Sequence, residues 1–83
     1  MQVILSEKAS REFRRLPKPD QSKIKIRLTL LKDNPLAGKK LEGKLKNDRS
    51  LRAWPYRIIY SINKKMNRVE VSGILHRKES YKN

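Results

Sequence analysis

The clearest structural signal in the chain lies in residues 49–62, which read RSLRAWPYRIIYSI. Aromatic and β-branched residues alternate here with polar ones at a period of two, which is the pattern of half-buried strands. Pro55 has no backbone N–H to donate to a strand ladder, so it belongs in a turn or at the first position of a strand. We therefore predict two strands joined by a tight turn at Trp54–Pro55.

Arginine lies on both sides of this turn. Arg52 precedes it and Arg57 follows it, so strand pairing would bring the two side chains close together. Two cations held on a rigid sheet repel each other unless an anion lies between them. The hairpin is therefore the first candidate for an anion-binding site; the alternative is that both arginines simply face water.

The length and charge of the chain narrow its function. A chain of 83 residues forms one small domain. It has 22 Lys and Arg against eight Asp and Glu, a net charge of +14, and no Cys. A cationic folded body attracts nucleic acid or another polyanion, although solubility alone is the plainer explanation. The lack of cysteine excludes disulfides and thiolate metal sites and fits the cytoplasm. No apolar run approaches the roughly 20 residues of a membrane span, so no membrane association is expected.

The first half of the chain predicts a strand followed by two helices. Residues 1–6 are typical of a short strand, and Ser6 fits the N-cap of a helix that ends before Pro17. Pro19 is suited to the first turn of a second helix, which stops at Asn34–Pro35. Three residues form the apolar stripe of this helix, Ile24, Leu28 and Leu31, and two more, Ile26 and Leu30, are expected to widen it.

The second half predicts the remainder of a sheet. Residues 36–48 indicate a loop rich in Lys and Gly, residues 68–78 a last strand, and residues 79–83 a short tail. Strict alternation along the last strand places on one face Val69, Val71, Gly73, Leu75 and Arg77. The expected fold class is α+β over residues 1–83, in the order β-α-α-β-β-β, with a helical hairpin on one face of a small antiparallel sheet.

The side chains favour phosphate chemistry over metal or nucleophile chemistry. The acidic residues are scattered and there is a single His, so no metal-ligand spacing or Ser/His/Asp set stands out, and no cofactor is expected. Arginines can support cleavage of RNA, because the 2′-hydroxyl of RNA is its own nucleophile. The protein must then align the phosphate, stabilise its extra negative charge and move protons.

Five residues are candidates for these tasks. Arg52, Arg57 and Arg77 could stabilise charge on phosphate oxygens. Tyr81 or His76 could stack on a base or move a proton, but a tyrosine needs nearby cations to act as a base, since its ordinary pKa is about 10. Each has a plainer alternative as a solvent-facing cation, a surface histidine or a packing tyrosine.

The order of elements and several short motifs together resemble the RelE/ParE toxin superfamily. The motifs are Leu16-Pro17, Asn34-Pro35, Leu41-Glu42-Gly43, YRIIY at residues 56–60 and LHRKESY at residues 75–81. The resemblance covers essentially the whole chain and is closer to the RelE branch. Members of that branch are toxins of type II toxin–antitoxin systems that enter the ribosomal A site and cut mRNA.

The resemblance implies a cytoplasmic, metal-independent mRNA endoribonuclease that depends on the ribosome and inhibits translation. It also implies two kinds of partner. One is the ribosomal A site with its mRNA and rRNA. The other is a cognate antitoxin in a hetero-oligomeric complex, which can bind operator DNA through the antitoxin.

Residue by residue, the family's catalytic groups fall on matching positions. Its arginine after the hairpin turn falls on Arg57, its arginine near the end of the last strand on Arg77, and its C-terminal tyrosine on Tyr81. Arg52 is a further catalytic candidate on the strand before the turn. Contacts to RNA and the ribosome are expected from Lys39, Lys40, Lys44, Lys46, Arg49 and His76.

The chain departs from the family pattern in the hairpin. Trp54–Pro55 stands where a Gly-Asp turn is common, and an aromatic or basic residue is often found where Asp48, Arg49 and Ser50 stand. The identity of the general base therefore stays open. Two other functions stay open as well: a ParE-like inhibitor of DNA gyrase that does not cleave RNA, and an inactive relic that binds only an antitoxin and DNA.

Overall fold

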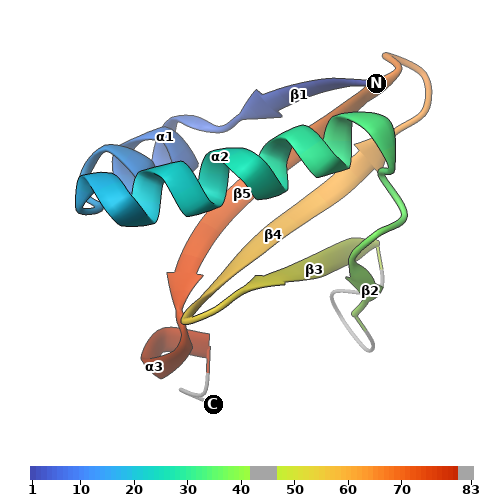
Figure 1. Cartoon of the computed structure of the whole chain (residues 1–83). Helices are drawn as coiled ribbons and strands as arrows, with labels where there is room; N and C mark the ends of the chain where they lie inside the picture. The colour runs from blue at the N-terminus through green and yellow to red at the C-terminus, as the bar shows by residue number, and fades with distance from the viewer. Residues whose placement is uncertain (42–46, 81–83) are drawn as a thin grey trace.

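A computed structural model of the chain describes residues 1–41 and 47–80 and shows two helices packed on one face of a sheet (Figure 1). The strands are β1 (Gln2–Leu5), β2 (Lys39–Lys40), β3 (Asp48–Ala53), β4 (Tyr56–Asn63) and β5 (Arg68–His76). The helices are α1 (Glu7–Arg14), α2 (Lys18–Asp33) and the short α3 (Arg77–Ser80). Among the described residues, no helix is long and apolar enough to cross a membrane.

The five strands lie side by side in the order β1-β5-β4-β3-β2. Strands β3, β4 and β5 pair antiparallel, as expected, and β2 pairs antiparallel with β3. Strand β1 lies parallel to β5, so the sheet is mixed. The α+β class, the order of elements and the helical hairpin on one face are confirmed.

The predicted hairpin forms with its turn at Trp54–Pro55, whose peptide bond is cis. In the register of β3 and β4, Arg52 lies directly opposite Arg57. The prediction that pairing brings these two residues together is confirmed.

The helices begin and end close to the predicted residues. Ser6 caps α1 by accepting a hydrogen bond from the N–H of Ala9 at 3.0 Å. Helix α2 has a proline in its first turn and ends at Asp33, with Asn34 as its C-cap before Pro35. Both limits follow from backbone chemistry, since a hydroxyl satisfies a free N–H at a helix start and proline cannot continue a helix.

The core lies between α2 and the sheet. Ile24 and Leu31 of α2 are fully buried, as are Ile58 and Tyr60 of β4. The prediction that two further α2 residues widen the apolar stripe is wrong: Ile26 is 68% exposed and Leu30 is 38% exposed. The sheet contacts a narrow face of α2, and these two positions lie beyond it.

A bulge in β5 corrects the faces predicted for that strand. Ile59 pairs with Gly73, but the next residue, Tyr60, pairs with Val71, so one extra residue, Ser72, is inserted in β5. An inserted residue inverts the alternation of side chains beyond it. The core face therefore changes from Val69 and Val71 to Ile74 and His76. Leu75, predicted to share the face of Val69 and Val71, lies opposite Arg57 on the other face.

The rest of the chain differs from the expected loop and tail in two places. Lys39 and Lys40, expected in a loop, form β2 and pair with Ser50 and Arg49. Residues 77–80, expected as a strand end and a tail, form α3. Three residues named from the sequence, Lys44, Lys46 and Tyr81, lie outside the described residues.

Candidate nucleic-acid interface

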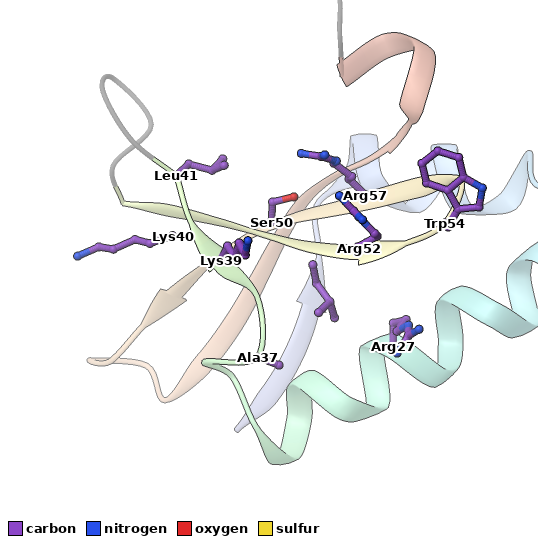
Figure 2. A pocket seen from close by; sticks show the side chains of 10 residues that line it. Arg27, Ala37, Lys39, Lys40, Leu41, Ser50, Arg52, Trp54 and Arg57 are labelled. Carbon is purple, nitrogen blue, oxygen red and sulfur yellow. The ribbon is translucent and has the colours of Figure 1, made fainter.

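An open groove of about 670 Å³ lies along β3, beside the edge of the sheet (Figure 2). Strand β2 pairs with β3 only at Arg49 and Ser50. In the described part of the chain, the remainder of that β3 edge, residues 51–53, has no further strand beside it, and Leu51 and Arg52 line the groove. The lining residues are Arg27, Ala37, Lys39, Lys40, Leu41, Ser50, Leu51, Arg52, Trp54 and Arg57.

The groove is strongly cationic. Five of the ten residues that line it are Lys or Arg, and none of these ten is acidic. Figure 2 shows Trp54 at the turn end of the groove, Lys40 and Leu41 at the opposite end, and Arg52 and Arg57 between them. A concave surface with one sign of charge concentrates ligands of the other sign, so the groove suits a chain of phosphates.

The strand pattern explains why two arginines face the groove together. Leu51 and Ala53 of β3 and Ile58 of β4 are buried against the helices. The residues between them, Arg52 and Arg57, therefore lie on the opposite face of the sheet, directly across from each other. Guanidinium groups on neighbouring strands can make two-pronged hydrogen bonds to one phosphate, and the strand register fixes the backbone positions from which both extend.

Arg77 reaches the same end of the hairpin from α3. Its backbone N–H donates a hydrogen bond to the carbonyl oxygen of Pro55 at 2.7 Å. Its guanidinium carbon lies 5.2 Å from the centroid of the Trp54 ring, within the range of a cation–π contact. Trp54 lines the groove whereas Arg77 does not. The structure therefore brings Arg77 close to Arg52 and Arg57 in the fold, but it adjoins the groove through the indole ring.

His76 lies on the face of the sheet that meets the helices. It is opposite Tyr56 in the register, and the two rings meet edge to face with their centroids 5.5 Å apart. Its Nδ1 accepts a hydrogen bond from the N–H of Lys78 at 3.2 Å. The hydroxyl of Tyr56 donates to Oδ2 of Asp20 at 2.6 Å. The structure does not bring His76 into the groove, and its contact with RNA stays a prediction.

Comparison with known proteins assigns the chain to a family. Residues 3–81 match the family described as ParE toxin of type II toxin-antitoxin system, parDE. The chain belongs to this toxin family. The resemblance to the RelE/ParE superfamily is confirmed, and the chain is a toxin of a type II toxin–antitoxin system.

Solved structures of such toxins share the fold. The toxin–antitoxin complex RelBE2 from Mycobacterium tuberculosis matches at a TM-score of 0.84 and 27% identity, over 92% of this chain and 96% of that chain. The YoeB/ParE toxin from Agrobacterium tumefaciens matches at 0.80 and 20% identity, over 92% and 98%. The isolated Escherichia coli RelE toxin matches at 0.76 and 23% identity, over 98% and 95%. No curated protein matches the sequence.

Two tyrosines of the toxin are poorly suited to remove a proton near neutral pH. The hydrogen bond to Asp20, burial of the ring and the charge of Asp20 raise the pKa of Tyr56 from 10.0 to about 12. Burial also raises the pKa of Tyr60, against the opposing effects of the Gly38 N–H and the Arg49 charge. A general base works best with a pKa near the operating pH, so neither hydroxyl fits that role.

We expect Asp20→Asn to lower the pKa of Tyr56 from about 12 toward 10, because the amide carries no charge and is a weaker acceptor. Titration of tyrosinate absorbance measures this shift, and Tyr56→Phe identifies which transition belongs to Tyr56. In the wild type the raised pKa contributes stability below pH 10, which is lost as the pH rises from 10 to about 12. An unchanged Tyr56 transition in Asp20→Asn would show that Asp20 is not the cause.

The segment before β2 is fixed by a small hydrogen-bond network. Tyr60 donates from its hydroxyl to the carbonyl oxygen of Pro35 at 2.7 Å and accepts from the N–H of Gly38 at 2.9 Å. Arg49, predicted to contact RNA, donates from Nη1 to the carbonyl oxygen of Gly38 at 2.8 Å. These bonds place Lys39, the next residue, at the groove. The contact of Arg49 with RNA stays a prediction, but its side chain already supports the groove wall.

Arg27 and Trp54 line the groove but were not assigned to a site from the sequence. Arg27 is an exposed residue of α2, and only the packing of α2 beside β3 brings it to the groove. Trp54 was predicted only as part of the hairpin turn, and the structure leaves it 54% exposed. The one sequence signal for Trp54 was its place in a turn that departs from the family pattern. Among residues 1–41 and 47–80, no cluster of three or more His, Cys, Asp or Glu could hold a metal ion.

Proposed function

We propose that this toxin is a ribosome-dependent endoribonuclease that cuts mRNA in the ribosomal A site. The observation that supports this most directly is the opposed pair Arg52 and Arg57 on the wall of a cationic groove. The pair can hold one phosphate, and the groove can follow the backbone on either side. A toxin located with ribosomes would act in the cytoplasm.

In the proposed reaction the 2′-oxygen of the RNA attacks the adjacent phosphorus. The new bond from 2′-oxygen to phosphorus forms as the 2′-hydroxyl loses its proton, and the bond to the 5′-oxygen breaks as that oxygen gains a proton, leaving a 2′,3′-cyclic phosphate and a 5′-hydroxyl. Arg52 and Arg57 donate hydrogen bonds to the non-bridging oxygens, which gain negative charge in the transition state. Because the substrate carries the nucleophile and arginines supply the charge, this reaction requires no metal ion.

The toxin contributes few groups for moving protons. Tyr56 and Tyr60 hold their protons too strongly, and His76 faces the helices. Of the residues named from the sequence, Tyr81 is left to stack on the substrate or transfer a proton. We infer that the ribosome orders the mRNA so that the 2′-oxygen lies in line with the leaving oxygen, a contribution that can exceed any single proton transfer.

A cognate antitoxin is the second proposed partner. Related structures include the RelBE2 complex from M. tuberculosis and the intact RelBE toxin–antitoxin complex from E. coli. For this chain, with its net charge of +14, an acidic segment of the antitoxin lying over the groove would neutralise the cations and block the phosphate site. Any binding to operator DNA would then come through the antitoxin.

Inhibition of DNA gyrase is the alternative function. It is favoured by the family match itself, since the matching family is that of the ParE toxins. The cationic groove favours RNA cleavage, because a pair of arginines on rigid strands is suited to a phosphate. The relic function has no structural observation in its favour.

We expect the purified toxin to cut a defined mRNA during translation in a purified system, at positions that map to the A site, and to leave free RNA largely intact. Mapping the new 5′ ends tests this, and adding the product of the neighbouring small open reading frame should stop the cutting if it is the antitoxin. Equal cleavage of free and ribosome-bound mRNA would contradict dependence on the ribosome. Intact mRNA with inhibited gyrase supercoiling would establish the alternative.

A further inference from the structure

Trp54 is the single tryptophan of the chain and is unusually exposed for its size. It lies in the hairpin turn with 54% of its surface exposed, and it lines the groove next to the arginine pair. Its ring adds apolar surface to a groove whose other walls are largely cationic. Exposed aromatic rings beside a cationic track are the usual means of binding single-stranded nucleic acid, because every base has a flat face that can stack.

The backbone of the turn that carries the indole is fixed by two hydrogen bonds. Lys23 of α2 donates from Nζ to the carbonyl oxygen of Trp54 at 3.0 Å, and the Arg77 N–H fixes the carbonyl of Pro55 at 2.7 Å. The guanidinium of Arg77 covers part of the ring, 5.2 Å from its centroid. Trp54 lines the groove, whereas Arg77 is not among the lining residues, so the ring borders the groove and also contacts this cation.

We propose that Trp54 is a stacking platform for an unpaired nucleobase of the strand whose phosphates lie at Arg52 and Arg57. Trp54 is two residues from Arg52, which is roughly 7 Å of extended chain and comparable to the length of one nucleotide. A base attached next to the bound phosphate can therefore reach the ring. The Arg77 guanidinium against the ring draws electron density from the indole, which favours electron-rich purines with their larger stacking area.

This proposal rests on the proposed function in one respect only, which is that the bound strand is mRNA. The competing explanation is that the ring merely positions Arg77 and has no contact with a base. The two differ in a measurable way. If Trp54 is a platform, affinity depends on whether the ligand carries bases. If Trp54 only supports Arg77, affinity depends only on the charge of the ligand backbone.

The test uses the fluorescence of Trp54 with two ligands of equal length and charge. One is a short single-stranded 2′-O-methyl oligoadenylate, which lacks the nucleophile and cannot be cut. The other is the corresponding abasic backbone. We expect the oligoadenylate to quench Trp54 saturably and to bind about 5- to 100-fold more tightly than the abasic strand. An oligouridylate should lie between them, and added salt should weaken all three.

Variants separate the platform from the support. Trp54→Phe should keep most of the preference for bases, as measured by anisotropy of labelled strands, whereas Trp54→Leu should bind the base-bearing and abasic strands equally. Equal affinity of the wild type for both strands, saturated binding without quenching, or no binding at low salt would each overturn the proposal.

The outcome is independent of the cleavage assay. Base-dependent quenching without mRNA cleavage would retain the platform and refute the nuclease, and cleavage without base dependence would do the reverse. Quenching by gyrase subunits but not by oligonucleotides would assign the ring to a protein partner and also overturn the proposal.

Discussion

Arg57→Ala is expected to bind programmed ribosomes nearly as well as the wild type and to cut mRNA about 10²–10³-fold more slowly. Arg57 is half-buried on β4 and fixed opposite Arg52 by the strand register. A donor aimed in advance at a phosphate strengthens its hydrogen bonds as charge develops, so its loss reduces turnover more than binding. Single-turnover rates at saturating toxin measure this directly.

Lys39→Ala is the matched control for Arg57→Ala, because it removes a cation from the same groove. Lys39 is exposed in the two-residue strand β2, so it serves as a point charge. Its loss should weaken ribosome binding modestly, flatten the salt dependence by roughly one unit of slope or less, and leave the saturated rate unchanged.

Arg77→Ala should be slow like Arg57→Ala if its cation reaches the phosphate past Trp54. Near wild-type cutting by saturating Arg57→Ala would reduce that residue to a docking contact.

The hairpin could be predicted from its local sequence. Which side chains of β5 lie on each face of the sheet, in contrast, depends on how β5 pairs with β4. Residues 49–62 contain their own alternation and their own turn, so the opposition of Arg52 and Arg57 follows by counting from Pro55. The extra residue Ser72 is visible only in the pairing of β5 with β4. The isolated Gly73 inside the strand pattern is a weak sign of a bulge, but strict alternation along residues 68–76 took no account of it and placed Leu75 on the wrong face.

Some groove residues could likewise be predicted from local sequence, whereas others lie at the groove only because of the tertiary structure. Arg52 and Arg57 were found because charge inside a strand pattern is unusual. Arg27 looks like any solvent-facing residue of a basic helix, and its role depends on how α2 crosses the edge of β3. The position of Trp54 was predicted, but its exposure was not, because exposure depends on what lies beyond the turn.

The largest effects on stability are expected at the contact between Gly38 and Tyr60, which supports the groove wall. A Cβ at Gly38 would lie 2.7 Å from the Tyr60 hydroxyl oxygen, 2.8 Å from Cε1 and 2.9 Å from the carbonyl oxygen of Ser50. Gly38→Ala should therefore lower the free energy of unfolding by about 1–3 kcal/mol through overpacking. Tyr60→Phe should cost about 1–3 kcal/mol, because it leaves the buried Gly38 N–H and the Pro35 carbonyl without the hydroxyl.

The double variant gives the sharper test. Tyr60→Phe removes the oxygen that the new Cβ meets first, so the combined loss should be smaller than the sum of the two single losses by about 0.5 kcal/mol or more. Gly73→Ala is the matched control, since its Cβ would meet its nearest neighbour, Glu12 Oε1, at an ordinary 3.6 Å. Denaturant unfolding of all four variants measures these differences. Strictly additive losses, or a Gly73→Ala variant as unstable as Gly38→Ala, would contradict this explanation. The close approach of Gly38 to the Tyr60 hydroxyl would then not be the cause of the lost stability.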